Sequence, residues 1–495
     1  MKNRLNKYLF FVLLIAMISS CSAPRKASSL QQPNILFIAV DDLRPELKAY
    51  GNKMMHTPHM DGLARQGRLF VNHYVNVPTC GASRYAMLTG RYPQTTAALA
   101  NNIFEKTTAG KLPGELPESL VELFRRNGYY TIGIGKISHA TDGKIYGYGQ
   151  PVSDRRELPN SWDELLFNAG KWGTGWNAFF GYANGENRQS LNWQAKPYEM
   201  ADVDDLGYPD GLTAGLAVSR IKNLQNEKKP FFLAVGFFKP HLPFTAPKKY
   251  WDLYREEDIE VSPVPGIPVS TSEASLHNSS EFNQYKETDE KPSLKNPVSD
   301  AYARKLKHAY YASVSYVDAQ IGKVLQALKE SGLDKNTIVV LWGDHGWHLG
   351  DQRVWGKHTL SEYSLKSPLI IRHPAMRQKG RLSAAIVQTV DIYPTLAQMA
   401  GLKLPYQMDG TSLYPILQNP SLISTQKAFA YFNNGITMRT ERYRITKYYN
   451  RGDVELYDYI KDPFESQNIA SENKQITDSL LLMLEEGNTG LYNKQ

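Results

Sequence analysis

Four apolar runs along the chain share one pattern: each is a short stretch of hydrophobic residues that ends abruptly in polar side chains. The runs cover residues 34–40, 130–135, 231–238 and 337–342. Runs of this length that are apolar on both faces are typical of buried parallel strands. In open α/β sheets the ligand crevice lies outside the carboxyl ends of the strands, so the four runs predict one shared site.

The polar groups that follow these runs are the first candidates for that site. They combine carboxylates, lysines and imidazoles, which are side chains able to bind a metal ion or to move a proton. In chain order they are Asp41 and Asp42, Lys136 and His139, Lys239 and His241, and Asp344 and His345.

Helical patterns separate the runs. Segments 118–126, 211–226 and 301–331 repeat apolar residues at helical spacing, and the last of them stops before Gly332. Strands that alternate with helices predict a doubly wound α/β domain, which we place at residues 33–420.

The pattern changes near residue 419, beyond which we expect a small α+β subdomain over residues 421–495. A helix is expected over 474–486 at its end. Short antiparallel strands joined by Asn-Gly and Arg-Gly turns are expected at 428–432, 435–438, 443–449 and 455–458.

Segment 263–300 is rich in Ser, Pro, Asn and charged residues and has no regular period. We expect a long surface insertion, which forms either a lid over the site or a disordered loop.

The N-terminus reads as an export signal. Three basic residues precede an apolar run over 9–18, which is too short for a comfortable membrane span, and small residues then lead to Cys21. The sequence before Cys21 resembles the bacterial lipoprotein box. We therefore predict a lipoprotein signal peptide over 1–20, lipidation of Cys21 and a tether over 21–32, with an ordinary secretory signal as the alternative. This predicts a lipid-anchored protein in the periplasm or at the cell surface of a Gram-negative bacterium.

Charge and cysteine content narrow the function classes. Removal of residues 1–20, with their three basic and no acidic residues, lowers the formal charge from +8 to +5. That mild excess favours an anionic substrate, but the chain has no dense basic run of the kind that binds nucleic acid. The two cysteines are Cys21 and Cys80, so lipidation of the first leaves the second unpaired and excludes a disulfide framework.

The adjacent carboxylates of Asp41 and Asp42 indicate a metal ion. Two ionised groups at one strand end repel each other unless a cation lies between them, and hard oxygen ligands suit Ca²⁺ or Mg²⁺. Asp344 adds a third carboxylate at an equivalent position, and His345 can add a nitrogen.

Cys80 stands in a context unlike that of a buried structural thiol. Its neighbours are Thr, Gly, Ser and Arg rather than apolar residues, and a helix is expected to begin at Ser83. The run Cys80-Gly81-Ala82-Ser83-Arg84, followed by Leu-Thr-Gly-Arg at 88–91, resembles the signature of the sulfatase family, Cys-x-Pro/Ala-x-Arg. Ala82 stands where that signature more often has Pro.

Further motifs extend this resemblance over most of the chain. The nearest subgroup is the iduronate-2-sulfatase-like one, which the chain resembles at residues 241–244, 343–347, 348–350 and 355–357. Gly135-Lys136 with His139, Lys239-Pro240-His241, Gly343-Asp344-His345-Gly346 and Lys357 all resemble family elements. The resemblance implies an alkaline-phosphatase-like α/β fold, with a large mostly parallel sheet flanked by helices and a small C-terminal subdomain with an antiparallel sheet.

The resemblance also implies the chemistry. Cys80 would be oxidised to formylglycine (3-oxoalanine) by a formylglycine-generating or an anaerobic sulfatase-maturating enzyme. Ca²⁺ would be held by Asp41, Asp42, Asp344 and His345 together with residue 80. The catalytic side chains implied around the sulfate are Cys80, Arg84, Lys136, His139, His241 and Lys357.

The expected function is hydrolysis of sulfate esters in a sulfated glycan, with 2-O-sulfate on a uronic acid of a glycosaminoglycan or of ulvan as the expected target. Two alternatives are a phosphate-ester hydrolase of the same superfamily and a lipoprotein that binds sulfated glycans without turnover. His348 and His358 either line the substrate cleft or lie at the surface. Three arginines lie on an expected C-terminal strand, namely Arg439, Arg442 and Arg444. One of them is a candidate for binding a substrate carboxylate. The simpler interpretation of each is a side chain on an exposed face of the strand.

Overall fold

A sheet of eight strands organises the chain from residue 33 onward, in the order β12-β2-β11-β8-β1-β6-β3-β4. β11 pairs antiparallel with both of its neighbours, and the other neighbouring strands pair in parallel. The strands are β1 (Asn34–Val40), β2 (Arg68–Tyr74), β3 (Tyr130–Gly135), β4 (Glu164–Leu166), β6 (Phe231–Phe237), β8 (Thr337–Gly343), β11 (Leu369–Arg372) and β12 (Arg381–Gln388).

The four apolar runs of the sequence are the four central neighbours β8, β1, β6 and β3. Each is buried along nearly its whole length, as expected for strands that are covered on both faces. All four run in parallel, so their carboxyl ends meet at one edge of the sheet. The predicted mostly parallel α/β sheet is confirmed.

The computed structural model describes residues 32–492 except 193 and 423–426. The predicted signal peptide over 1–20, the lipidation site Cys21 and all of the tether except residue 32 lie outside the described residues. Within the described part of the chain, no helix combines the length and the apolar character that a membrane span needs.

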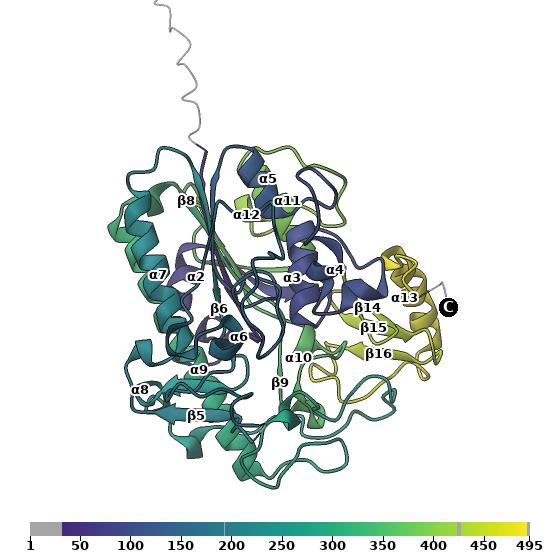
Figure 1. The fold of residues 1–495 in the computed structure, drawn as a ribbon. Coiled ribbons are helices and arrows are strands. Elements are labelled where there is room, and N and C mark those ends of the chain that lie inside the picture. Colours follow the sequence, from purple (N-terminus) through teal and green to yellow (C-terminus); the bar gives the residue numbers. More distant parts are fainter. Residues whose placement is uncertain (1–31, 193, 423–426, 493–495) are drawn as a thin grey trace, which may run out of the picture. The chain divides into compact units, whose positions relative to one another are not determined.

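Side chains of the central strands alternate between two hydrophobic cores, one on each face of the sheet. In β1, Leu36 and Ile38 pack on the side of α2, α7 and α9, whereas Ile35 and Phe37 pack on the side of α3, α5 and α11. Figure 1 shows α7 and α9 on one side of β6 and β8, and α5 and α11 on the other. The helices are α2 (Pro58–Gln66), α3 (Cys80–Thr89), α4 (Ile103–Thr107), α5 (Leu120–Arg126), α6 (Gly175–Phe179), α7 (Pro209–Leu224), α8 (Lys248–Trp251), α9 (Asp300–Glu330), α10 (Glu362–Leu365), α11 (Ile392–Met399), α12 (Tyr414–Gln418) and α13 (Lys474–Leu484).

The C-terminal part folds as an antiparallel sheet of four strands in sequential order, with α13 packed on it. This confirms the small antiparallel sheet expected there, which is drawn in yellow-green in Figure 1. The domain boundary near residue 420 stays a prediction. The strands are β13 (Ala428–Phe432), β14 (Gly435–Arg439), β15 (Tyr443–Tyr448) and β16 (Val454–Asp458), and two further pairs are β5 (Tyr198–Ala201) with β7 (Phe244–Pro247) and β9 (His348–Leu349) with β10 (Trp355–Gly356).

Segment 263–300 is an irregular but packed segment, which corrects the expectation of a disordered loop. Its first part lies on the C-terminal sheet, where Val269 N–H donates to Ser466 O at 2.9 Å and Thr271 Oγ1 donates to Glu455 Oε1 at 2.6 Å. Its middle part buries Phe282 in the main core. The segment thus connects the C-terminal sheet to the edge where the central strands end.

Candidate active site

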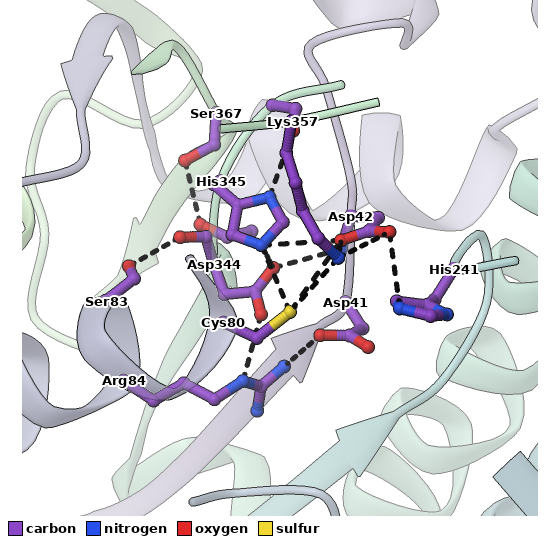
Figure 2. Close-up of polar contacts among 12 residues, drawn as sticks. Asp41, Asp42, Cys80, Ser83, Arg84, His241, Asp344, His345, Lys357 and Ser367 are labelled. Atoms are coloured by element: carbon purple, nitrogen blue, oxygen red, sulfur yellow. Dashed lines mark hydrogen bonds and ion pairs between the residues drawn. The ribbon is translucent and has the colours of Figure 1, made fainter. Parts of the chain in front are cut away.

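Carboxylates, a thiol and cationic side chains meet where β1, β3, β6 and β8 end. Figure 2 shows the side chains of Asp42, Cys80, Asp344 and Lys357 turned toward one another. Asp41 and Asp42 follow β1 directly, and Asp344 follows β8. The shared site predicted from the strand ends is therefore assembled in space from segments far apart in the sequence.

The donor atoms of this cluster form two overlapping groups. One atom each from Asp41, Asp42, Cys80 and His241 lie within 4.8 Å of one another, and so do atoms of Cys80, Asp344 and His345. Asp42 lies in the left-handed region with a φ of 57°, a conformation that aspartate tolerates better than most residues and that recurs at functional sites.

Arg84 holds two of the three carboxylates in place. Its Nε atom lies 2.9 Å from Asp344 Oδ2, and its Nη2 atom lies 3.0 Å from Asp41 Oδ1. Nη1 donates to the backbone oxygen of Lys136 at 2.5 Å. The side chain is fully buried, so its charge and its planar fork fix the carboxylates without competition from water.

The pKa values of the three carboxylates are shifted in different directions. Burial alone would raise the pKa of Asp41, but the nearby Lys136 and Arg84 outweigh burial and hold that pKa well below its usual range. Burial raises the pKa of Asp42 well above the usual range despite Lys357, and burial also raises the pKa of Asp344. At these two carboxylates burial thus outweighs the neighbouring cations.

The donor set fits a divalent cation. Three buried carboxylates offer the hard oxygen ligands that Ca²⁺ prefers, and an imidazole lies within reach as a fourth donor. A cation among them would favour the ionised forms of the two carboxylates whose pKa burial raises. The residues that fit this role are the predicted ones: Asp41, Asp42, Asp344 and His345, with residue 80 beside them.

Cys80 is the first residue of α3, so the helix begins three positions earlier than the expected start at Ser83. Its Sγ atom lies 3.2 Å from His345 Nε2 and 3.3 Å from Lys357 Nζ. Burial and the neighbouring Asp41 raise the pKa of the thiol to about 12, so the unmodified side chain is protonated at neutral pH. Only glycine fits at position 81, because a Cβ atom there would lie 2.3 Å from the Asn101 carbonyl oxygen.

The predicted basic residues surround the same cluster. Lys136 Nζ lies 2.7 Å from Asp41 Oδ2, and Lys357 Nζ lies 2.9 Å from Asp42 Oδ1. His241 Nε2 lies 3.7 Å from Asp42 Oδ2. His139 is half-buried, and its Nδ1 atom, itself shielded from solvent, has no hydrogen-bond partner among the described residues.

A pocket of about 290 Å³ opens beside the cluster. The predicted residues Cys80, Lys136, His139, His241 and Lys357 all line it. His358, one of the candidates for the cleft, lines it too. The sequence gave no sign of the remaining lining residues, which are Asn101, Tyr148, Trp176, Phe179, Phe180, Arg188, Ser280, Glu281 and Gln284.

Glu281 is the acidic residue of the pocket that sequence reasoning missed. It comes from segment 263–300, and its Oε1 atom lies 3.2 Å from both His241 Nε2 and Lys357 Nζ. Burial alone would raise its pKa, but the charge of Lys357 and the contact with His241 hold that pKa well below its usual range. Segment 263–300 thus contributes a charged residue to the pocket wall. Of the two alternatives, this agrees better with a lid than with a disordered loop. Nothing in its polar composition marks this residue.

The C-terminal arginines do not line the pocket, which corrects the hypothesis that one of them binds a substrate carboxylate. Arg439 Nε lies 3.3 Å from Glu362, Arg442 forms an ion pair with Asp458, and Arg444 donates to Glu465. Each guanidinium is held by a carboxylate of the chain itself.

Of the two histidines whose place the sequence left open, His348 is buried and His358 is half-buried. His358 lines the pocket, as one of the two readings proposed. His348 lies away from the pocket lining, between the backbone oxygen of Asp351 at 3.0 Å and the Thr359 hydroxyl at 2.9 Å.

Comparison with known families gives two overlapping matches. The family model described as Sulfatase matches residues 33–402, and the one described as N-sulphoglucosamine sulphohydrolase, C-terminal, matches residues 343–489. A protein named Sulfatase from Formosa agariphila is 32% identical over 94% of this chain and 89% of its own length. Iduronate 2-sulfatase from Mus musculus is 31% identical over 81% of this chain and 74% of its own length.

Solved structures share the fold over nearly the whole chain. The phosphonate monoester hydrolase of Agrobacterium radiobacter superposes with a TM-score of 0.71 at 24% identity, covering 92% of this chain and 96% of its own. A protein described as a 2-O GAG sulfatase superposes with a TM-score of 0.66 at 22% identity, covering 93% and 92%. At these identities the likeness establishes the architecture alone, and it confirms the fold class expected from the sequence.

Proposed function

The chain belongs to the sulfatase family and is a sulfuric ester hydrolase, and we propose that its substrate is a sulfated polysaccharide or an oligosaccharide derived from it. The favoured target is a 2-O-sulfate on a uronic acid of a glycosaminoglycan or of ulvan. Relatives named Iduronate 2-sulfatase, at 31% identity, and Ulvan-active sulfatase, at 27% identity, support this choice.

The single observation that carries the proposal is the position of Cys80. Its Sγ atom lies 4.0 Å from Asp42 Oδ1 and 3.3 Å from Lys357 Nζ, and Cys80 lines one pocket with Lys136, His139 and Lys357. A sulfate monoester is an anion that resists nucleophiles, so a reacting group among neutralising charges is what its hydrolysis requires.

A bound metal ion and a modified Cys80 would complete the proposed site. Ca²⁺ held by Asp41, Asp42, Asp344 and His345 would supply Lewis-acid chemistry toward a sulfate oxygen. Formylglycine, made from Cys80 by a formylglycine-generating or anaerobic sulfatase-maturating enzyme, would supply the nucleophilic oxygen.

The chain's own residues then have separable tasks. Arg84 fixes Asp41 and Asp344, as its two contacts with them indicate. Lys136 and Lys357 place positive charge where the sulfate oxygens would lie. His139, which lines the same pocket as Cys80, would take a proton from the nucleophile at residue 80.

His241 is the preferred proton donor to the leaving alcohol, and Lys357 is the alternative. The Nδ1 atom of His241 contacts the backbone oxygen of Leu242 at 2.6 Å, so that nitrogen carries the hydrogen and Nε2 faces the pocket. Burial and Lys357 lower the pKa of His241 to about 4, whereas the contact with Glu281 acts in the opposite direction. Glu281 thus favours the protonated form of His241, which burial and Lys357 disfavour.

Export as a lipid-anchored protein remains a prediction, as does the Gram-negative host. Such an address suits an enzyme that acts on polysaccharides outside the cytoplasm.

The test is peptide mass spectrometry across Cys80, combined with sulfate release from 2-O-sulfated uronate oligosaccharides. The protein should come from its native host or from co-expression with a maturation enzyme. The expected result is a formylglycine mass and sulfate release that Cys80→Ala abolishes. Faster release of phosphate from phosphate esters would favour the phosphate-ester alternative. An unmodified thiol in a competent host, with tight glycan binding and no release, would favour the non-catalytic binding protein.

A further inference from the structure

Arg188 lies in the pocket wall at a position that no sequence motif marks. Its side chain is 4% exposed, yet it borders the same cavity as Cys80, Lys136 and Lys357. Arginine is rarely buried to this extent without a task, because desolvation of the charge is costly. The guanidinium is therefore a candidate for contact with a group of the substrate.

The guanidinium is fixed in orientation by its neighbours. Its Cζ atom lies 3.6 Å from the centroid of the Phe180 ring, and Nη1 donates to Gln284 Oε1 at 3.0 Å. The Phe180 ring centroid lies 6.2 Å from that of His241. Arg188 is thus packed against an aromatic ring that also borders the proposed proton donor.

The other cations of the pocket are committed to the sulfate end. Lys136 Nζ lies 2.7 Å from Asp41, and Lys357 Nζ lies 2.9 Å from Asp42, so both are tied to the acidic cluster around Cys80. Arg188 instead contacts the Phe180 ring and Gln284. The pocket therefore offers two separate places for negative charge.

Building on the proposed function, we infer that Arg188 binds the carboxylate of the sulfated uronic acid, and so acts as a specificity-determining residue. The planar fork of a guanidinium matches a carboxylate with two parallel hydrogen bonds, which an ammonium group cannot reproduce. The substrate class is a sugar that carries a sulfate ester and a carboxylate on one ring.

The aromatic wall beside Arg188 suits the sugar ring between these two anions. Trp176 and Phe180 are nearly parallel, with an interplanar angle of 17°, and Tyr148 meets the Trp176 ring edge-on at 5.0 Å. Tyr148 is half exposed and lines the pocket. Aromatic faces pack well on the apolar face of a pyranose while its hydroxyls stay hydrogen-bonded.

The experiment compares two substrates across three variants of the matured enzyme. One substrate is a 2-O-sulfated uronate disaccharide, and the other is the same disaccharide with the carboxylate reduced to a hydroxymethyl group. The variants are Arg188→Gln, Arg188→Lys and the control Arg155→Gln, whose side chain is 65% exposed and lies outside the pocket lining.

Arg188→Gln is expected to lower kcat/KM for the uronate about 100-fold, the range of a hydrogen bond to a charged group, and to lower it only roughly threefold for the reduced sugar. Arg188→Lys should fall between, and Arg155→Gln should match the wild type. Melting temperatures of the variants check that each is folded.

Equal losses on both substrates would overturn the role of Arg188 and leave the proposed function standing. A wild type that cleaves the reduced sugar as fast as the uronate would also overturn that role. A wild type that cleaves neither substrate, but releases sulfate from another glycan, would overturn the uronate target and the role of Arg188 together.

Discussion

Glu281 Oε1 lies 3.2 Å from His241 Nε2, although the two residues come from a loop insertion and from the end of β6. The same oxygen lies 3.2 Å from Lys357 Nζ. One carboxylate thus contacts both of the side chains proposed to protonate the leaving alcohol. It positions these groups and favours their charged forms, without being placed to react itself.

Glu281→Gln is expected to slow hydrolysis of sugar sulfates about tenfold and to leave 4-nitrophenyl sulfate nearly unaffected. A sugar alcohol needs a proton to leave, whereas nitrophenolate leaves without one, so loss of the charge beside His241 matters only for the former. Steady-state kinetics on both esters measures this split. Glu273→Gln, in the same segment but exposed and bonded to Arg451, is the matched control. Equal losses on both esters would show that Glu281 acts on folding or binding alone.

Chelation of Ca²⁺ should lower both activity and the thermal midpoint, and added Ca²⁺ should restore both. A ligand that binds only the folded state at a hundredfold excess over Kd adds about 2.7 kcal/mol to the free energy of unfolding. Differential scanning fluorimetry with EGTA measures the shift, and EGTA already saturated with Ca²⁺ is the control. Asp344→Asn should lose most of the Ca²⁺-dependent shift. An unchanged midpoint on chelation would argue against a calcium site.

Arg444→Met should destabilise the fold by about 3–5 kcal/mol, because it leaves the buried carboxylate of Glu465 without its partner. Chemical denaturation measures this loss. Kinetic constants per folded molecule should stay at the wild-type level, since Arg444 lies outside the pocket. Arg442→Gln, which removes an exposed ion pair with Asp458, should change unfolding little. If Arg444→Met selectively raised KM for carboxylated substrates, that result would instead show that Arg444 contributes to substrate binding.

His73 should make stability fall on acidification. Burial lowers its pKa to about 4, and its ring lies 3.0 Å from the Ser367 backbone oxygen. The ordinary pKa of the unfolded state is about 6.5. The folded state therefore keeps the neutral form while the unfolded state takes up a proton, and the contribution is present above pH 6.5 and is lost as the pH falls toward 4. The full loss amounts to about 3 kcal/mol.

Urea denaturation between pH 7 and pH 4 measures this dependence. His73→Gln should be less stable at neutral pH and should show a shallower decline on acidification. His56→Gln, at an exposed position, should follow the wild-type slope. Parallel slopes for His73→Gln and the wild type would contradict the assignment.

The part of the fold that the sequence predicted is the part fixed by continuous burial. β8, β1, β6 and β3 are apolar on both faces, so their type and their polar ends were readable from one pattern. β12 was not readable, because its burial is mixed along its length. The antiparallel β11 has an apolar run, but direction within a sheet depends on partners far along the chain.

The residues of the candidate site also fall into those that the sequence revealed and those that it did not. Asp41, Cys80 and Lys136 stand in short motifs attached to regular elements, so spacing revealed them. Arg188 and Glu281 lie in irregular segments, whose position depends on packing against remote parts of the chain. An arginine or glutamate in a polar loop carries no local signal that separates a pocket residue from a solvated surface charge.

Segment 263–300 is attached to the C-terminal sheet, and this attachment limits which parts of the chain can be replaced by those of a related protein. Val269 and Thr271 are anchored on residues of that sheet region, while Glu281, ten positions later, faces the reacting groups. A chimera that takes this segment from a relative with another glycan preference would misplace its pocket wall unless the matching C-terminal strands were transplanted with it. Divergence of substrate preference is then expected to appear as paired changes in two distant stretches of the chain.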